Sequence, residues 1–175
     1  DANVVSGFNV RLAKNGETIT TLDGSVRNLH TEDLVICNAS DDAPVGIAGV
    51  MGDQHSEITD ATTTLNFEVA WFAADPIRFS ANRHGLRTEA SARFERGVDP
   101  EAFDLAAQRF VTILRETSPD ATLHAGTSVV STDGLVPPAV VTLTADRVSK
   151  LLGVEIPLQT MVELLEPIGY STSVS

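Results

Sequence analysis

Apolar and polar residues alternate in short runs through the first third of the chain, a pattern typical of half-buried β-strands. Two of these runs, residues 8–13 and 18–22, are each closely followed by an Asn-Gly or Asp-Gly pair. Such pairs are strong signals for tight turns between strands. We therefore predict short strands joined by hairpins in this part of the chain, followed by a buried strand at residues 33–39.

A glycine-rich apolar run, Val-Gly-Ile-Ala-Gly-Val-Met-Gly, occupies residues 45–52. Three glycines weaken a strand, but they let a ligand or another backbone come close. We therefore treat this run as a candidate binding element.

Residues 63–72 form the longest predicted strand, and one acidic residue, Glu68, interrupts its apolar sequence. The two-residue period of a strand places Glu68 on the same face as Asn66 and Ala70. That face either points to solvent or lines a pocket, where the carboxylate could accept a hydrogen bond from a ligand hydroxyl. The pattern by itself leaves both interpretations open.

Helical patterns follow. An Asp-Pro pair at residues 75–76 predicts a helix that ends near Gly85. Thr88 is suited to cap a second, short helix. A further Asp-Pro pair opens a longer helix over residues 100–116. One face of that helix is predicted to contact the core, and its residues are Phe103, Ala107, Phe110, Val111 and Leu114.

The pattern changes after a Pro-Pro pair at residues 137–138, which predicts a domain boundary. We predict one domain over residues 1–136 and the truncated start of a small helical domain over 139–175, with a strand at 140–144 and two helices. The second segment is too short to bury an independent core comfortably. Together the patterns predict an α+β fold with a mostly antiparallel, barrel-like sheet core and packed helices.

The composition is that of a packed protein, since 42% of the residues are hydrophobic and 21% are charged. No apolar run approaches the roughly 20 residues that span a bilayer, and we find no charged-then-apolar leader. The single cysteine, Cys37, excludes an intramolecular disulfide, and its apolar neighbours place it in the core. We expect a cytoplasmic protein without membrane contact.

A net charge of −12 makes the chain a poor candidate for wrapping duplex nucleic acid. Five of the twelve basic residues nevertheless fall within residues 78–96. Either these arginines pair with nearby carboxylates on the surface, or some of them form a small basic rim that contacts RNA phosphates. The rim would consist of Arg78, Arg83 and Arg87.

No complete catalytic or metal-binding motif is found. The four histidines lack the spacing of metal ligands, the calcium-loop spacing is missing, and neither a nucleophile elbow nor a phosphate loop occurs. We predict no metal site and no cofactor in this chain, and the catalytic residue stays unassigned.

Four strings in one order resemble the editing module of bacterial phenylalanyl-tRNA synthetase β subunits. They are Gly-Ile-Ala-Gly-Val-Met-Gly at 46–52, Glu-Val-Ala-Trp-Phe at 68–72, Arg-His-Gly-Leu-Arg-Thr-Glu-Ala-Ser at 83–91 and Arg-Phe-Glu-Arg-Gly-Val-Asp-Pro at 93–100. The likeness extends from Val10 to about Leu114. Residues 140–175 resemble the opening of the next β-subunit domain, a helical module of the kind called DNA-binding-like.

The resemblance implies an editing pocket and assigns roles to five residues. Glu68 matches the carboxylate that recognises the phenol hydroxyl of tyrosine. Gly49 and Gly52 match glycines that keep the pocket open, while Thr88 and Ala90 match small residues of the pocket wall.

The chain also departs from the family pattern. Asp53 stands where the family commonly has a further glycine, which affects the loop after Gly52. A family histidine that lines the pocket, within a His-Ala-Phe-Asp string, would lie just before Asp1.

The resemblance implies a fragment of an aminoacyl-tRNA synthetase, a ligase of protein biosynthesis. Its function would be RNA binding and post-transfer editing, the hydrolysis of tyrosine mischarged on phenylalanine tRNA. Its partners would be that tRNA, the synthetase α subunit and a second β subunit, with ATP and magnesium serving the full heterotetramer. The alternatives are a non-catalytic scaffold or RNA-docking module, and a free-standing trans-editing hydrolase of the same fold.

Overall fold

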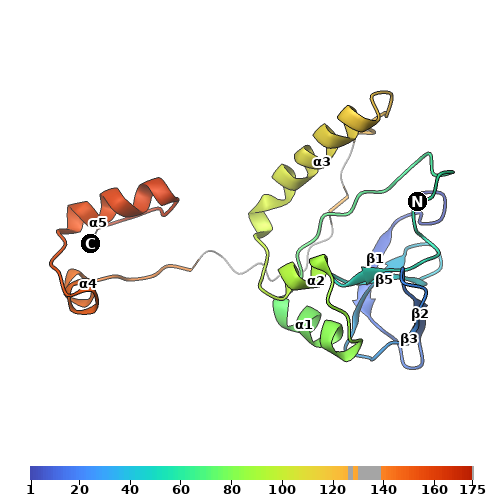
Figure 1. The fold of residues 1–175 in the computed structure, drawn as a ribbon, viewed down its shortest axis with the longest axis horizontal. Helices are drawn as coiled ribbons and strands as arrows, with labels where there is room; N and C mark the ends of the chain where they lie inside the picture. The colour runs from blue at the N-terminus through green and yellow to red at the C-terminus, as the bar shows by residue number, and fades with distance from the viewer. Residues whose placement is uncertain (126–127, 130–138, 175) are drawn as a thin grey trace. The chain divides into compact units, whose positions relative to one another are not determined.

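The computed structural model describes residues 1–125, 128–129 and 139–174 of the chain. The chain divides into two compact units, Asp1–Gly126 and Thr127–Ser175, and each is described by itself (Figure 1). The predicted boundary at residues 137–138 lies outside the described residues, so the domain division into 1–136 and 139–175 stays a prediction.

A four-stranded antiparallel sheet forms the centre of the first unit, with the strand order β1-β4-β5-β6. Its strands are β1 (Phe8–Leu12), β4 (Leu34–Asn38), β5 (Pro44–Ile47) and β6 (Met51–Gly52), and a separate hairpin pairs β2 (Thr18–Thr20) with β3 (Val26–Asn28). The α+β class with an antiparallel sheet is confirmed. The expected barrel is not closed, because β1 and β6 lie at opposite edges of the sheet.

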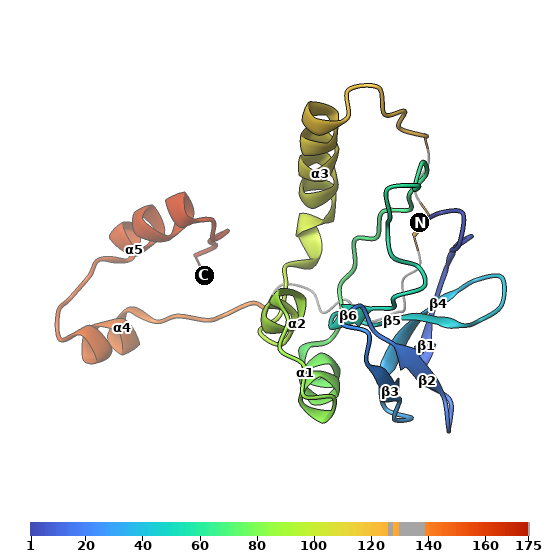
Figure 2. The same cartoon turned by 45° about the vertical axis from the view of Figure 1, so that its right-hand side comes forward.

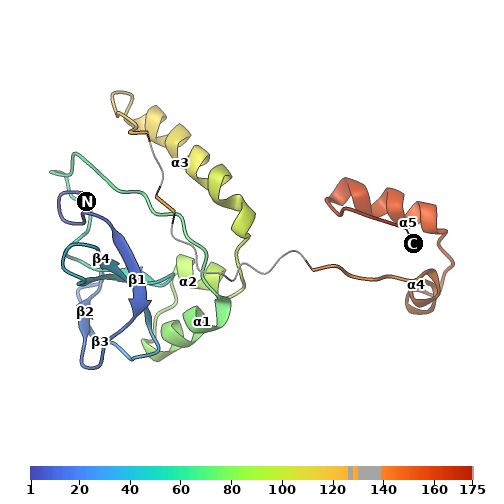
Figure 3. The ribbon, with the colours of Figure 1, turned by 180° about the vertical axis from the view of Figure 1, so that it is seen from behind.

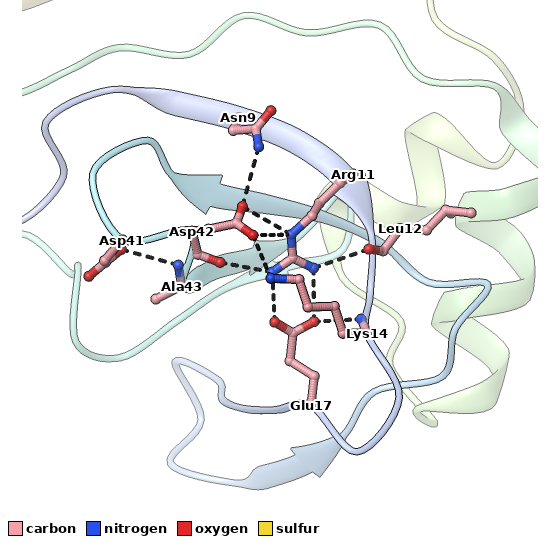
Figure 4. A network of polar contacts seen from close by, with 8 residues as sticks. All are labelled: Asn9, Arg11, Leu12, Lys14, Glu17, Asp41, Asp42 and Ala43. Atoms are coloured by element: carbon pink, nitrogen blue, oxygen red, sulfur yellow. Dashed lines mark hydrogen bonds and ion pairs between the residues drawn. The ribbon is translucent and has the colours of Figure 1, made fainter.

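The two predicted turns have different outcomes. The Asp-Gly turn joins β2 to β3 as expected, with Gly24 at φ 76°. The Asn-Gly turn also bends the chain, but β1 pairs with β4 and not with β2. A polar network holds this arrangement, since Arg11 of β1 contacts Asp42 between β4 and β5 at 3.0 Å and Glu17 beyond the turn at 2.7 Å (Figure 4).

The core of the first unit lies between the sheet and α1 (Ala74–Arg83). Val35 and Cys37 of β4 are fully buried, and Ile77 of α1 packs into the same cluster. The core position predicted for Cys37 is therefore confirmed. Helix α1 begins one residue before the predicted cap, so Asp75 lies in its first turn, where the helix dipole favours a negative charge.

The predicted strand over residues 63–72 is not formed, because this segment is extended but pairs with no strand among the described residues. Its backbone receives one hydrogen bond, from the Ala2 N–H to the Thr64 carbonyl at 2.9 Å. A strand requires a neighbour at ladder distance, which a local residue pattern does not specify. Figure 2 shows the chain leaving the sheet after β6 and returning to α1.

The residues after α1 form α2 (Glu89–Phe94), a 3₁₀ turn η1 (Pro100–Ala102) and α3 (Phe103–Thr117). The predicted core-facing residues of α3 are half-buried and the rest of the helix is exposed, so the face is correct but its depth was overestimated. The face is only half-buried because it meets the extended segment of residues 63–72. Phe110 of α3 stacks on Phe67 of the extended segment, with ring centroids 3.8 Å apart (Figure 3 shows α3 and this segment).

The second unit contains α4 (Ala145–Leu152), α5 (Leu158–Leu165) and the 3₁₀ turn η2 (Glu166–Ile168). Both helices were predicted, but the strand expected at 140–144 has no partner among the described residues and is not formed. Met161 is the one described residue of this unit that is buried. Leu158 and Leu164 of α5 are exposed. No described helix of either unit is both long and apolar enough to cross a membrane.

Candidate functional site

A cavity of about 640 Å³ lies in the first unit. Most of its lining comes from the first residues of the chain, the glycine run at 45–52, the extended segment and α2, and the rest comes from Phe8, Leu22, Ile36 and Ser56. Most of its wall is apolar, with Val5, Ile36, Val50, Phe72 and Phe94 among the lining residues. The volume is that of a pocket for a small ligand, which occupies about 300–1,000 Å³.

The five predicted pocket residues all lie on the wall of this cavity. The fold thus brings Gly49 and Gly52 of the glycine run, Glu68 of the extended segment, and Thr88 and Ala90 at the start of α2 to one place. The role of each residue stays a prediction, although all five residues lie around the same cavity.

Glu68 faces the cavity because its segment keeps a two-residue period. Asn66, Glu68, Ala70 and Phe72 line the cavity, while Phe67 points the other way, to α3. The face that Glu68 shares is therefore the cavity wall and not an open sheet surface, although the cavity mouth leaves Glu68 accessible to water.

The carboxylate of Glu68 is chemically available to a ligand. Desolvation by the surrounding protein atoms raises the pKa of Glu68 above its usual range. None of the hydrogen bonds or ion pairs found among the described residues involves this side chain. Both of its oxygens are therefore free to accept a hydrogen bond from a ligand donor that enters the cavity.

The two pocket glycines have different surroundings. Gly49 has φ +66°, and a Cβ there would lie 3.2 Å from the Phe94 ring and 3.3 Å from Cγ2 of Ile77. A Cβ at Gly52 would meet Leu22 at 3.6 Å, an ordinary contact. Gly49 therefore serves the packing of the glycine run against α1 and α2, whereas Gly52 borders the open cavity next to Leu22, which also lines it.

Thr88 caps α2, as predicted. Its Oγ1 accepts the Ser91 N–H at 3.0 Å, and the Ser91 hydroxyl accepts the Thr88 N–H at 2.9 Å, a reciprocal capping box. The Thr88 hydroxyl also donates to the Val50 carbonyl at 2.7 Å. Ala90 follows within the first turn and presents only a methyl group to the cavity.

Sequence reasoning assigned no role to Asn66, which shares the face of Glu68. Its Nδ2 donates to the Val5 carbonyl at 2.8 Å. This bond joins the extended segment to the first residues of the chain, which also line the cavity. The period-two pattern placed Asn66 correctly, but nothing in the sequence indicated Val5 as its partner.

Each arginine of the predicted rim lies beside a carboxylate. The partners are Asp75 for Arg78 at 2.9 Å, Asp33 and Glu32 for Arg83, and Glu95 for Arg87 at 3.9 Å. Arg78 and Arg87 thus fit the surface ion-pair interpretation, whereas Arg83 also pairs with the fully buried Asp33. Phosphate contact by these arginines stays a prediction.

A buried carboxylate that sequence reasoning missed lies outside the cavity. Asp33 is fully buried and accepts hydrogen bonds from Ser80 at 2.7 Å, His84 at 2.7 Å, the His30 N–H at 2.8 Å, and Arg83. Desolvation opposes ionisation, but these hydrogen bonds outweigh it and hold the pKa of Asp33 below its usual range. The acceptor is fully used, so the cluster joins the turn before β4 to α1 and has no free group for chemistry.

A second hollow of about 610 Å³ lies beside β2. Its buried carboxylate, Asp53, accepts the N–H groups of His55 and Ser56 at 3.0 and 3.2 Å, together with the Ser56 hydroxyl. Asp53 therefore caps its own turn, and we assign the hollow no ligand. In the part of the chain that the structure describes, no three His, Cys, Asp or Glu side chains gather as a metal site.

Comparison with known proteins supports a specific family. Residues 1–119 match the model of the B3/4 domain. The chain is 41% identical over 168 residues to the phenylalanine–tRNA ligase β subunit of Lactiplantibacillus plantarum, covering 96% of this chain and 20% of that protein.

The same similarity extends to other bacteria. The β subunit of Latilactobacillus sakei is 39% identical over 181 residues, covering 99% of this chain and 22% of that protein. The β subunit of Streptomyces avermitilis is 41% identical over 171 residues, covering 96% of this chain and 20% of that protein. The chain thus spans about a fifth of the length of these relatives, and it belongs to the B3/4 domain family found in phenylalanine–tRNA ligase β subunits.

Proposed function

We propose that this chain carries an editing site, which binds the tyrosyl end of mischarged phenylalanine tRNA and supports hydrolysis of its ester bond. The observation that carries the proposal is the Glu68 carboxylate, which meets no partner among the described residues and stands in the wall of a largely apolar cavity. The five pocket positions implied by family resemblance lie around that one cavity.

The chemistry explains why such a site is useful. Tyrosine and phenylalanine differ by one hydroxyl, and an apolar pocket rejects an added hydroxyl only weakly. A second site can instead require the hydroxyl. Tyrosine would donate a charge-assisted hydrogen bond to Glu68, worth about 1–3 kcal/mol, whereas phenylalanine has no hydroxyl to make it.

Hydrolysis at this site would use a water molecule. Among the described residues that line the cavity, no serine, threonine or cysteine is hydrogen-bonded to a histidine base. The wall would hold the tyrosyl group so that a water reaches the ester carbonyl, and the group that activates this water stays unassigned.

The wider setting is proposed from the relatives. A longer protein containing this chain would assemble with an α subunit and a second β subunit, bind phenylalanine tRNA in the cytoplasm, and charge it with phenylalanine. We place ATP and magnesium at the aminoacylation centre of that ligase and not in this cavity.

The test is to fill the cavity in the complete ligase. Gly52→Trp and Ala90→Trp should each strongly lower deacylation of tyrosyl-tRNA, because the indole ring would fill the space that the tyrosyl group needs. Phenylalanine charging should stay close to that of the parent. Unchanged deacylation in both variants would contradict the proposal and favour a scaffold or RNA-docking role, and joint loss of both activities would indicate misfolding.

A further inference from the structure

The Thr88 hydroxyl makes its hydrogen bonds within the protein, although Thr88 lines the cavity. Its proton is donated to the Val50 carbonyl at 2.7 Å, and one lone pair accepts the Ser91 N–H at 3.0 Å. A hydroxyl has a single proton, so Thr88 has none left to donate to a ligand. Its polar group instead joins two walls of the cavity, the glycine run and the start of α2.

Ser91 holds Thr88 in the position that makes this junction. It is 1% exposed and does not line the cavity. Its hydroxyl accepts the Thr88 N–H at 2.9 Å and contacts the Thr88 carbonyl at 3.2 Å. These two contacts, with the bond from the Ser91 N–H, fix both the backbone and the side chain of Thr88.

An apolar contact joins the same two walls independently. Gly49 lies so close to the Phe94 ring at the end of α2 that a Cβ would approach it to 3.2 Å. The glycine run is therefore held against α2 at both ends of this short helix, by Thr88 at its start and by Phe94 at its end. Gly52 and Ala90 border the space between these walls.

We propose that Ser91 is a positioning residue for tyrosyl-ester hydrolysis. Acting through Thr88, it holds the glycine run at a fixed distance from α2 and so sets the width of the cavity. The inference rests on the proposed editing function. Loss of this junction would leave the ligand loosely held, and misplacement of a reacting ester by about 1 Å can cost 10²-fold in rate.

The test measures kcat and KM for deacylation of tyrosyl-tRNA by the complete ligase. Ser91→Ala should lower kcat by between about tenfold and 10²-fold. Thr88→Val should have a similar effect, and the double variant should be no slower than Thr88→Val alone, because both changes break one junction. Thr88→Ser keeps the hydroxyl and should recover most of the kcat that Thr88→Val loses.

Ser80→Ala is the matched control, since Ser80 is also 1% exposed but bonds Asp33 away from the cavity. It should lower the melting temperature and leave kcat at the parent value. The inference is overturned if Ser91→Ala deacylates at the parent rate, if the effects of Thr88→Val and Ser91→Ala multiply, or if Ser80→Ala slows deacylation equally. If the parent ligase does not deacylate tyrosyl-tRNA, the editing function itself is wrong, and the inference falls with it.

Discussion

At the scale of single residues, Glu68 and Asp33 show two different settings for a carboxylate, one open to water at a cavity wall and one fully buried. Asp33 is surrounded by donors that use its oxygens and lower its pKa. Glu68 meets no donor among the described residues, and desolvation raises its pKa. The first arrangement stabilises the fold, while the second leaves the carboxylate open to a ligand and is typical of a binding site.

Removing the Glu68 carboxylate should therefore affect selectivity. In the complete ligase, Glu68→Ala should reduce the preference for deacylating tyrosyl-tRNA over phenylalanyl-tRNA by roughly 1–3 kcal/mol, the scale of one charge-assisted hydrogen bond. Comparison of kcat/KM for the two esters measures this change. Glu89→Ala is a control, because Glu89 also borders the cavity but pairs with Arg93 at 2.6 Å. Parent selectivity in Glu68→Ala would mean that Glu68 only faces solvent.

The two glycines should differ when each gains a methyl group. Gly49→Ala should lower the free energy of unfolding by about 1–3 kcal/mol, because a positive φ strains L-residues and the new Cβ would press on Phe94. Gly52→Ala should change it by less than about 0.5 kcal/mol, since its Cβ makes an ordinary contact. Urea denaturation of both variants measures the difference, and equal losses would contradict these packing assignments.

At the scale of elements, the Asp33 cluster fastens α1 to the start of β4. Removing one partner of a buried ion pair costs about 3–5 kcal/mol, and the partial exposure of Arg83 places Asp33→Ala at the lower end of that range. Asp75→Ala should cost much less, because Asp75 and its partner Arg78 are both exposed. Thermal unfolding of the two variants measures the contrast, which equal losses would contradict.

The sign of the pH dependence at Asp33 follows from its lowered pKa. The stabilising contribution of the carboxylate is complete above the unfolded pKa of about 3.9 and is lost as the pH falls through the lower folded pKa. The stability difference between the parent and Asp33→Ala should therefore be largest near neutral pH and shrink in acid. A constant difference across that range would mean that the charge of Asp33 does not matter.

Elements with local signals were predicted well, and elements that depend on distant partners were not. Thr88 with its α2 cap and the Asp-Gly hairpin between β2 and β3 each involve residues within one turn. The pairing of β1 with β4 and the unpaired state of residues 63–72 depend on contacts between remote segments. The same limit applies to the site, where the face of Glu68 was predictable but the cavity in front of it was not.

At the scale of the whole molecule, the two units differ in how much they bury. The first has a contiguous core, while the described part of the second buries only Met161. The net charge of −12 also offers tRNA little attraction, so most docking of the tRNA body would fall to the rest of the ligase.

Removing residues 139–175 should leave the stability of the remainder nearly unchanged. We expect a shift in melting temperature below about 4 °C, equivalent to less than about 1 kcal/mol. A peptide of residues 139–175 should show weak helicity by circular dichroism, because helices of eight residues are marginal alone. Cooperative melting of that peptide would contradict the expectation that this segment lacks its own core.

The two-residue period of the extended segment also limits how its length can vary. Phe67 meets α3 while the adjacent Glu68 faces the cavity, so a single residue inserted or deleted within this segment would exchange the two faces after that point. An aromatic ring would then enter the cavity and a carboxylate would meet Phe110. Length changes of one residue should therefore be excluded between Leu65 and Phe72 in functional relatives, whereas the exposed turn at residues 57–61 can absorb them.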